Sequence, residues 1–343
     1  MKRRAWAILL APALLSACLR TSAPGVSGLV ASADPAAATG DPADALRAVY
    51  LGSGGWILQY GGDMVLTGPL FTNPGLLTTG LLPIRSDSAL VDRYMSRYDV
   101  SGARAILVGH AHYDHLMDVP GVARRHAPSA RIVGSRTVAN TLGTWAGLEG
   151  RVDVVDEGAA DQETVGRWHA YGDRVRVMAL RSHHAPHFDG YTLYRGTRDT
   201  PRTEEPAWAT DWVDGETYAF LIDFMATSSS GADSIAFRVY YQDAVSPAPA
   251  GFAPDALMAE RPVDVAILVP ATFDQVDWHP EAFVENLRPR YVLLGHWEDF
   301  FSPMDAPTRS MRLTDIRHFE RRLERVFDGQ WWRPDRWTEL HLH

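Results

Sequence analysis

The fold of this chain is decided by the stretch AILVGHAHYDHL at residues 105–116. Its apolar start is typical of a strand that is buried on both faces. His110 and His112 follow two residues apart, so their side chains lie on the same side if the strand end is extended. Asp114 and His115 come next, as the chain turns. Four potential metal ligands therefore converge at the carboxyl end of a buried strand, where open α/β sheets place their ligands.

The four side chains suit a metal site better than a polar loop. Neutral imidazole and carboxylate are ligands for zinc, manganese or iron. A hydrogen-bonded polar loop is the alternative, but so many convergent ligand groups rarely serve packing. Because two histidines cannot close a zinc site, further ligands must come from elsewhere in the chain.

Three later apolar runs end in further candidate ligands. RVRVMAL leads into SHHAPH at 182–187, SIAFRVYY leads to Asp243, and RYVLLG leads to His296. The pattern of an apolar strand with a ligand at its exit thus occurs four times. One shared cleft would require this arrangement.

The rest of the body alternates between strand-like and helical patterns. Short strand-like runs come first, at 48–52, 56–60 and 64–68, and glycine-rich turns separate them. Further strands are predicted at 103–108, 130–135, 174–180, 234–241, 263–270 and 290–297, and helices at 86–98, 118–126 (with Asp118 as N-cap), 137–145, 279–287 and 308–327. This order predicts an α/β fold with helices outside one large mixed sheet or two sheets. The end of the chain, with His341 and His343, is expected to be frayed.

Composition restricts the classes of function. The 343 residues are 46% hydrophobic, which is enough for a large core. The net charge of -9 and the lack of a basic stripe argue against a nucleic-acid partner. Cys18 is the only cysteine, so any metal site in the body must use His, Asp and Glu.

The metal motif and its order resemble the metallo-β-lactamase superfamily of binuclear metallohydrolases. The stretch at 110–115 matches the signature H-x-H-x-D-H, and the later ligands follow in the matching order His, Asp, His. The resemblance runs from about 49 to 303 and implies a four-layer αββα sandwich with two divalent metal ions between the sheets. It implies that His110, His112 and His184 hold one metal, that Asp114, His115 and His296 hold the other, and that Asp243 bridges both.

Three histidines compete for one of these ligand positions. His184 is preferred because relatives place their ligand directly before a small residue, which is Ala185 here. His183 is the alternative. His183 and His187 could also support the ligands or face the substrate. For Asp243 the alternative is an ordinary turn aspartate.

Two segments are similar to a branch of the superfamily. VYLGSGGW and LLGHWEDF resemble the ascorbate-phosphate lactonase-like and N-acyl phosphatidylethanolamine phospholipase D-like enzymes. The chain departs from that branch at Thr67-Gly68-Pro69, where Asp-Pro is usual, and around Asp243, where Gly-Asp-Thr is usual. The first departure removes a carboxylate that would support the ligands.

The resemblance implies a hydrolase that cleaves an ester, lactone or phosphodiester bond with a metal-bridged hydroxide. Asp114 would be catalytic, orienting the nucleophile or accepting its proton. Zinc is the first choice of metal, with manganese or iron as alternatives. The substrate is a small molecule or a lipid, and aromatic side chains are expected to wall the cleft: Trp208, Trp212, Trp278, Trp297, Phe300 and Phe301. The competing hypotheses are a non-enzymatic zinc-binding lipoprotein and an inactive scaffold; the oligomeric state stays open.

The N-terminus predicts export. Residues 1–18 have a basic start, an apolar stretch shorter than the ~20 residues that span a bilayer, and the sequence Leu-Ser-Ala-Cys. This ending resembles the lipobox of bacterial lipoproteins, which implies cleavage before Cys18 and its lipidation; a plain secretory signal is the alternative. Residues 19–46 are expected to be a flexible tether and 47–343 the hydrolase domain. We therefore expect a cell-envelope lipoprotein, anchored to the membrane and facing the periplasm or the exterior.

Overall fold

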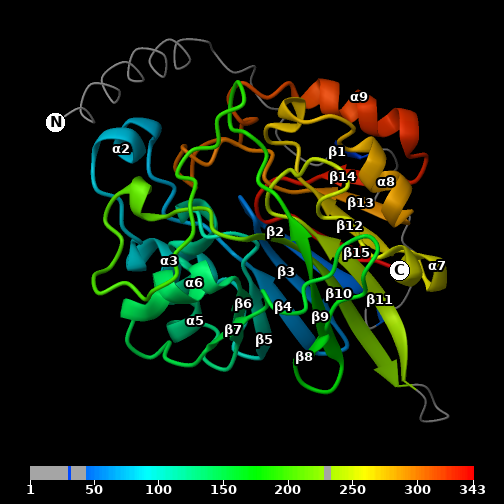
Figure 1. The fold of residues 1–343 in the computed structure, drawn as a ribbon, viewed down its shortest axis with the longest axis horizontal. Helices are drawn as coiled ribbons and strands as arrows, with labels where there is room; N and C mark the ends of the chain where they lie inside the picture. The colour runs from blue at the N-terminus through cyan, green and yellow to red at the C-terminus, as the bar shows by residue number, and fades with distance from the viewer. Residues whose placement is uncertain (1–29, 32–43, 228–232) are drawn as a thin grey trace.

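Two mixed β-sheets pack face to face, with helices on their outer faces (Figure 1). The computed structural model describes residues 30–31, 44–227 and 233–343. This is the four-layer αββα sandwich of the α/β class, as the sequence predicts. Within the described ranges, no helix is long and apolar enough to cross a bilayer.

The first sheet has seven strands in the order β15-β2-β3-β4-β5-β6-β7. Strands β15 to β4 pair antiparallel, whereas β4 to β7 pair parallel. A two-residue turn at Gly61 and Gly62 joins β3 to β4, and both residues have positive φ, as this type of hairpin requires. The strands are β2 (Leu46–Gly52), β3 (Gly55–Tyr60), β4 (Asp63–Thr67), β5 (Ala103–Leu107), β6 (Arg131–Gly134), β7 (Val152–Val154) and β15 (Glu339–Leu342).

The second sheet has eight strands in the order β1-β14-β13-β12-β11-β10-β9-β8. Its strands β8 to β11 form an antiparallel meander, and β11 to β14 run parallel. The strands are β1 (Val30–Ala31), β8 (His169–Ala170), β9 (Val175–Ser182), β10 (Thr217–Thr227), β11 (Asp233–Tyr241), β12 (Val265–Leu268), β13 (Tyr291–Leu294) and β14 (Gln330–Arg333).

Helices lie outside both sheets. The first sheet is flanked by α3, α5 and α6, and the second by α7, α8 and α9 (Figure 1). The helices are α2 (Leu76–Leu81), α3 (Ser88–Met95), α4 (Tyr113–Leu116), α5 (Val119–Arg125), α6 (Arg136–Thr141), α7 (Asp255–Glu260), α8 (Glu281–Leu287) and α9 (Ile316–Val326), with the 3₁₀ turns η3 (Leu142–Thr144), η4 (Ala209–Asp211) and η5 (Phe273–Gln275).

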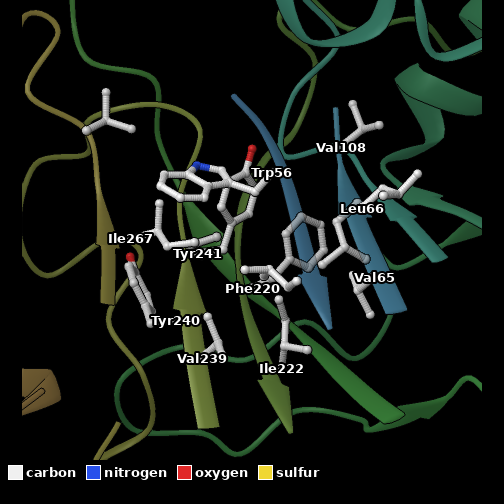
Figure 2. Close-up of a cluster of buried hydrophobic side chains, with 14 of the residues drawn as sticks. Trp56, Val65, Leu66, Val108, Phe220, Ile222, Val239, Tyr240, Tyr241 and Ile267 are labelled. Atoms are coloured by element: carbon white, nitrogen blue, oxygen red, sulfur yellow. The ribbon is translucent and has the colours of Figure 1, made fainter. Parts of the chain in front are cut away.

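The two sheets share a buried core (Figure 2). Trp56 and Leu66 of the first sheet pack near Phe220, Ile222 and Tyr241 of the second, and all five are fully buried. Burying each such side chain contributes about 1.5–3 kcal/mol. The Tyr241 hydroxyl also donates a hydrogen bond of 2.8 Å to the carbonyl of Gly54, which ties the two sheets together beside the site described below.

Most predicted elements are confirmed, but six of the strands were not foreseen. The sequence analysis gave no strand for β1, β7, β8, β10, β14 or β15. The prediction of a frayed end is wrong, because β15 pairs with β2 and closes the edge of the first sheet. The predicted helix at 308–327 begins only at Ile316, after a loop.

The N-terminal predictions fall largely outside the described residues. These predictions concern the signal segment with Cys18 and most of the expected tether. Two tether residues, Val30 and Ala31, form β1 and pair with β14. The first sheet begins at Leu46, one residue before the expected start of the domain.

Asp118 does not cap α5 in the expected way. It precedes the helix, but its side chain makes no capping hydrogen bond there. Its fully buried carboxylate instead accepts hydrogen bonds from the backbone N–H groups of Phe71 (2.7 Å) and Thr72 (2.8 Å) and from the hydroxyls of Thr72 (2.8 Å) and Ser86 (2.6 Å). Asp118 therefore fastens the loop after β4 to the start of α5, next to the segment that carries the H-x-H-x-D-H motif.

We expect Asp118→Ala to lower the free energy of unfolding by about 3 kcal/mol, because the buried N–H group of Phe71 and the half-buried N–H group of Thr72 lose their acceptor. Asp87 caps α3 through the N–H groups of Ala89 and Leu90 in an exposed setting, so Asp87→Ala should cost only about 1 kcal/mol. Urea denaturation of both variants measures the difference. Equal losses would show that the Asp118 network does not stabilise the fold.

Candidate metal centre

The candidate ligands meet at one edge of the sandwich, where four strands end. His110 and His112 follow β5, and α4 adds Asp114 and His115 directly afterwards. The other strands contribute one ligand each: His184 follows β9, Asp243 follows β11 and His296 follows β13. Their ligand atoms form three overlapping groups, each within 4.8 Å: His110, His112 and His184; His110, His115 and Asp243; Asp114, His115 and His296.

The first group presents imidazole nitrogens. The Nε2 of His112 lies 3.1 Å from the carbonyl of Leu193 and the Nδ1 of His184 lies 2.6 Å from the carbonyl of Ala185. A nitrogen that faces a carbonyl carries the proton, which leaves the other nitrogen free to bind a metal. Burial lowers the pKa values of His110, His112 and His184, so these imidazoles are neutral.

The group of Asp114, His115 and His296 surrounds a carboxylate oxygen. The Oδ2 of Asp114 lies 3.2 Å from the Nε2 of His115 and 3.2 Å from the Nε2 of His296. Two ligands at about 2.0–2.1 Å from one tetrahedral zinc lie roughly 3.3 Å apart, so the spacing suits a shared cation. Burial favours a raised pKa for Asp114, but the charge of nearby His115 and the hydrogen bond from His296 outweigh burial and hold this pKa well below its usual value. Asp114 is therefore ionised.

Asp243 belongs to the remaining group, which shares His110 with the first group and His115 with the group of Asp114. Its Oδ1 is 2.9 Å from the Nδ1 of His110, and its Oδ2 accepts a hydrogen bond of 2.8 Å from the N–H of Gly109. The Oδ2 is also 3.6 Å from the Nδ1 of His115. The contact with His110 fixes the proton on Nδ1 and leaves Nε2 to face the first group. Asp243 can thus orient His110 as well as supply an oxygen between two ions.

Several buried nitrogens at the centre fit bound cations. Among the described residues, the Nε2 of His110, both ring nitrogens of His115 and the Nδ1 of His296 are buried and make no hydrogen bond. Such atoms are costly unless a partner satisfies them. A donor set of imidazole nitrogens and carboxylate oxygens suits zinc, manganese or iron. The residues therefore fit two divalent ions, and their chemistry does not select one metal.

The SHHAPH segment sends its histidines in different directions. His184 joins the first group, whereas His183 is exposed and belongs to none of the three groups. His187 stacks on His184 with ring centroids 4.6 Å apart and planes at 13°. The N–H of Leu193 donates to the Nδ1 of His187 at 3.1 Å, and burial lowers the pKa of His187 to about 3. A neutral His187 therefore carries its proton on Nε2.

Glycines let the backbone approach the candidate ligands. A Cβ at Gly109 would lie 2.3 Å from the Oδ1 of Asp243, and a Cβ at Gly54 would lie 2.4 Å from the Nδ1 of His115. Real Cβ atoms do not come so close to other heavy atoms. These two positions therefore require glycine for steric reasons.

His296 is held by a group of residues that the sequence analysis missed. Its backbone has a φ of 51°, and its N–H donates to the Tyr50 hydroxyl at 2.9 Å. Tyr50 in turn donates to the buried carboxylate of Glu298, which also accepts from the N–H of Ser53. Burial raises the pKa of Tyr50 well above its usual value, so its hydroxyl stays protonated. Glu298 lies close to His296 in the sequence, so its role could have been suspected from the sequence. Tyr50 is brought to His296 only by the tertiary fold.

A cavity of ≈ 190 Å³ opens beside the centre. Of the six aromatic residues that the sequence suggested for its wall, only Phe300 and Phe301 line it. The prediction is wrong for the tryptophans: Trp212 and Trp297 are buried elsewhere and Trp208 and Trp278 are exposed. The lining residues are Leu76, Asp114, His184, His187, Phe188, Leu193, Asp243, Ala244, Val245, Val269, Ala271, Thr272, His296, Phe300, Phe301, Met311, Arg312 and Leu313.

Comparison with known proteins gives one family. Residues 72–297 match the model of the Beta-lactamase superfamily domain. Similar solved structures include the metallo hydrolase Igni18 from Ignicoccus hospitalis (15% identity, 87% of this chain and 99% of that chain covered, TM-score 0.49) and the metallo-beta-lactamase fold protein YhfI from Bacillus subtilis (11%, 87% and 99%, 0.47). Another is the isothiocyanate hydrolase from Delia radicum gut bacteria (11%, 86% and 98%, 0.49). No curated protein matches the chain significantly.

We expect Gly109→Ala to weaken metal binding by about 10–100-fold, because the added methyl group must displace Asp243. Gly102→Ala is the matched control, since a Cβ there meets nothing within 4 Å. Titration of both purified variants with zinc against a chelating dye measures the affinity. Unchanged affinity in Gly109→Ala would mean that the position of Asp243 does not matter for the metal.

Proposed function

Because the chain belongs to the beta-lactamase superfamily and is a metallohydrolase, we propose that it cleaves an ester, lactone or phosphodiester bond at a pair of divalent ions. One observation carries this proposal. Three groups of buried ligand atoms overlap through His110 and His115, so two cations would lie side by side in one continuous centre. The ascorbate-phosphate lactonase-like and phospholipase D-like branch stays part of the proposal.

Each cation would have its own ligands. The first would be held by His110, His112 and His184, and the second by Asp114, His115 and His296. Asp243 would contribute from between them. When bound, such a pair of ions supplies a water activated for attack near neutral pH and polarises the carbonyl or phosphoryl oxygen of the substrate. Zinc is our first choice, with manganese or iron as alternatives.

Asp114 would act on the attacking water. It is ionised and lines the cavity, so its carboxylate can accept a hydrogen bond from that water and then its proton. The contacts with His115 and His296 hold the carboxylate in one orientation. No serine or cysteine nucleophile is needed for this reaction.

His187 would assist at the substrate. It lines the cavity, and the Leu193 N–H bond to Nδ1 leaves the proton on Nε2. A protonated Nε2 can donate a hydrogen bond to a substrate oxygen on which negative charge develops. The apolar side chains of Val245, Phe300 and Phe301 would exclude bulk water from this position.

The geometry favours the enzyme over a zinc-carrying lipoprotein. A carrier would hold an exchangeable ion in a mobile histidine-rich tract. Here the candidate ligands come from four strand ends of the buried core, and neighbouring His183 and His184 face different surroundings. The cavity beside the candidate ligands also offers a place for a substrate.

Replacing His184 with Gln is expected to reduce the metal content from two ions per chain to one and to lower hydrolysis at least about 100-fold, because a ligand of the first ion is lost. His183→Gln should leave both values unchanged, since His183 is exposed and outside the cluster. Asp243→Ala should also lower the metal content. Elemental analysis and a panel of 4-nitrophenyl esters, lactones and bis(4-nitrophenyl) phosphate provide the measurements. One ion in the wild type with an unaffected Asp243→Ala variant would favour the carrier or a mononuclear enzyme.

We also propose that the protein is a lipoprotein of the cell envelope, on the basis of Leu-Ser-Ala-Cys before residue 19. Cys18→Ser should abolish incorporation of labelled palmitate and release the protein from the membrane fraction, since the acceptor sulfur is lost. Labelling and fractionation of cells that express each form test this. Export of an unlabelled wild type would favour the plain secretory signal.

A further inference from the structure

The cavity beside the metal centre has one fixed positive charge in largely apolar surroundings. Leucine, valine, phenylalanine and methionine side chains supply much of its lining. Apart from histidines, the charged residues in the lining are Asp114, Asp243 and Arg312. Both aspartates belong to the candidate metal centre. The proposed function assigns no role to Arg312, the remaining charged residue.

Arg312 is held in place by a buried carboxylate. Its Nε donates to the Oδ2 of Asp299 at 3.1 Å, and the side chain of Asp299 is only 3% exposed. Asp299 also accepts hydrogen bonds from the N–H of Phe301 (3.1 Å) and the hydroxyl of Ser302 (3.3 Å). One carboxylate therefore positions both the cation and an aromatic residue of the cavity wall.

The backbone fixes Arg312 relative to the metal centre. The N–H of Met311 donates to the carbonyl of Trp297 at 2.8 Å, and the N–H of Asp299 donates to the carbonyl of Arg309 at 2.8 Å. Trp297 directly follows the candidate ligand His296. The segment that bears Arg312 is thus paired with the loop that bears His296.

Arg238 provides a comparison, because its role is purely structural. Arg238 is fully buried, and its Nε, Nη1 and Nη2 all donate to protein oxygens, including both oxygens of Asp223. In the described part of the chain, Arg312 donates only through Nε, which leaves Nη1 and Nη2 for a ligand. Two parallel N–H donors of a guanidinium match the two oxygens of a carboxylate or phosphate.

We propose that Arg312 binds an anionic group, carboxylate or phosphate, on a substrate whose apolar part packs against Phe300, Phe301 and Leu193. The substrate is then an amphiphilic anion, with an acyl or aryl part in the cavity and its scissile bond at the metal centre. Arg312 is a specificity-determining residue, and Asp299 is the positioning residue behind it. The inference rests on the proposed function for the location of the reaction.

Binding of uncleavable probes tests the proposal. The probes are octanoate, octyl phosphate and neutral 1-octanol, titrated calorimetrically into the metal-loaded protein below their micellar concentrations. The wild type should bind at least one of the two anions about tenfold more tightly than octanol, because the anion gains a charge-assisted hydrogen-bonded pair. The more tightly bound anion identifies the group that Arg312 recognises.

Three variants make the test specific. Arg312→Gln should abolish the preference for the anion and leave octanol binding unchanged. Arg309→Gln is the matched control, because Arg309 is exposed, lies three residues away and does not line the cavity, so it should behave as the wild type. Arg312→Lys keeps the charge on Asp299 paired, and it should retain part of the preference even if the glutamine variant is poorly folded.

Two results would overturn the proposal. A preference that persists in Arg312→Gln would mean that the anion binds at the metal ions. A wild type that binds octanol as tightly as both anions would mean that the cavity recognises no charge. Because the probes contain no scissile bond, a protein that hydrolyses nothing on the ester, lactone and phosphodiester panel would contradict the proposed function and leave the binding result standing.

Discussion

The burial of two carboxylates among histidines constrains the rest of this structure. Asp114 and Asp243 are almost fully enclosed, and such charges are tolerated only when they are paired. Of the imidazoles in contact with them, His110 is neutral, because burial lowers its pKa. Burial also opposes protonation of His115, but the two carboxylates raise its pKa, so this ring supplies at most one positive charge for two carboxylates. Cations between these groups would neutralise the buried charge. Binding of the metal ions would therefore help to stabilise the folded core itself.

The two-sheet architecture meets this constraint by bringing distant segments together. The candidate ligands follow β5 in one sheet and β9, β11 and β13 in the other, so neither sheet alone could assemble the centre. Close approach of the backbone at Gly54 and Gly109 allows the histidines and Asp243 to occupy this narrow seam. The bond from Tyr241 to Gly54 fastens the sheets at the same place.

The sequence predicted the parts of the site that follow from local patterns. The spacing of His110 and His112 after an apolar run, and the ligands at three further strand exits, required only the geometry of strands. Arg312 and Tyr50 could not be predicted in this way, because backbone pairing and sheet packing bring them to the site from distant parts of the chain. Asp118 shows the opposite error: its position before a helix suggested a cap, but burial directed its carboxylate to another loop. For β15, four residues near the end gave too short a pattern to recognise.

The last strand, β15, protects the molecule from pairing with other chains. β2 is seven residues long and almost entirely buried, and without β15 its backbone N–H and C=O groups would form an open edge. An apolar edge of this kind is a template for pairing with another chain. The ribosome makes β15 (Glu339–Leu342) long after β2 (Leu46–Gly52), so this edge stays uncovered while the residues between the two strands are synthesised. The short strand β15 thus protects the chain from aggregation. Its loss would harm the solubility of the protein and would also loosen β2, whose Tyr50 holds the candidate ligand His296.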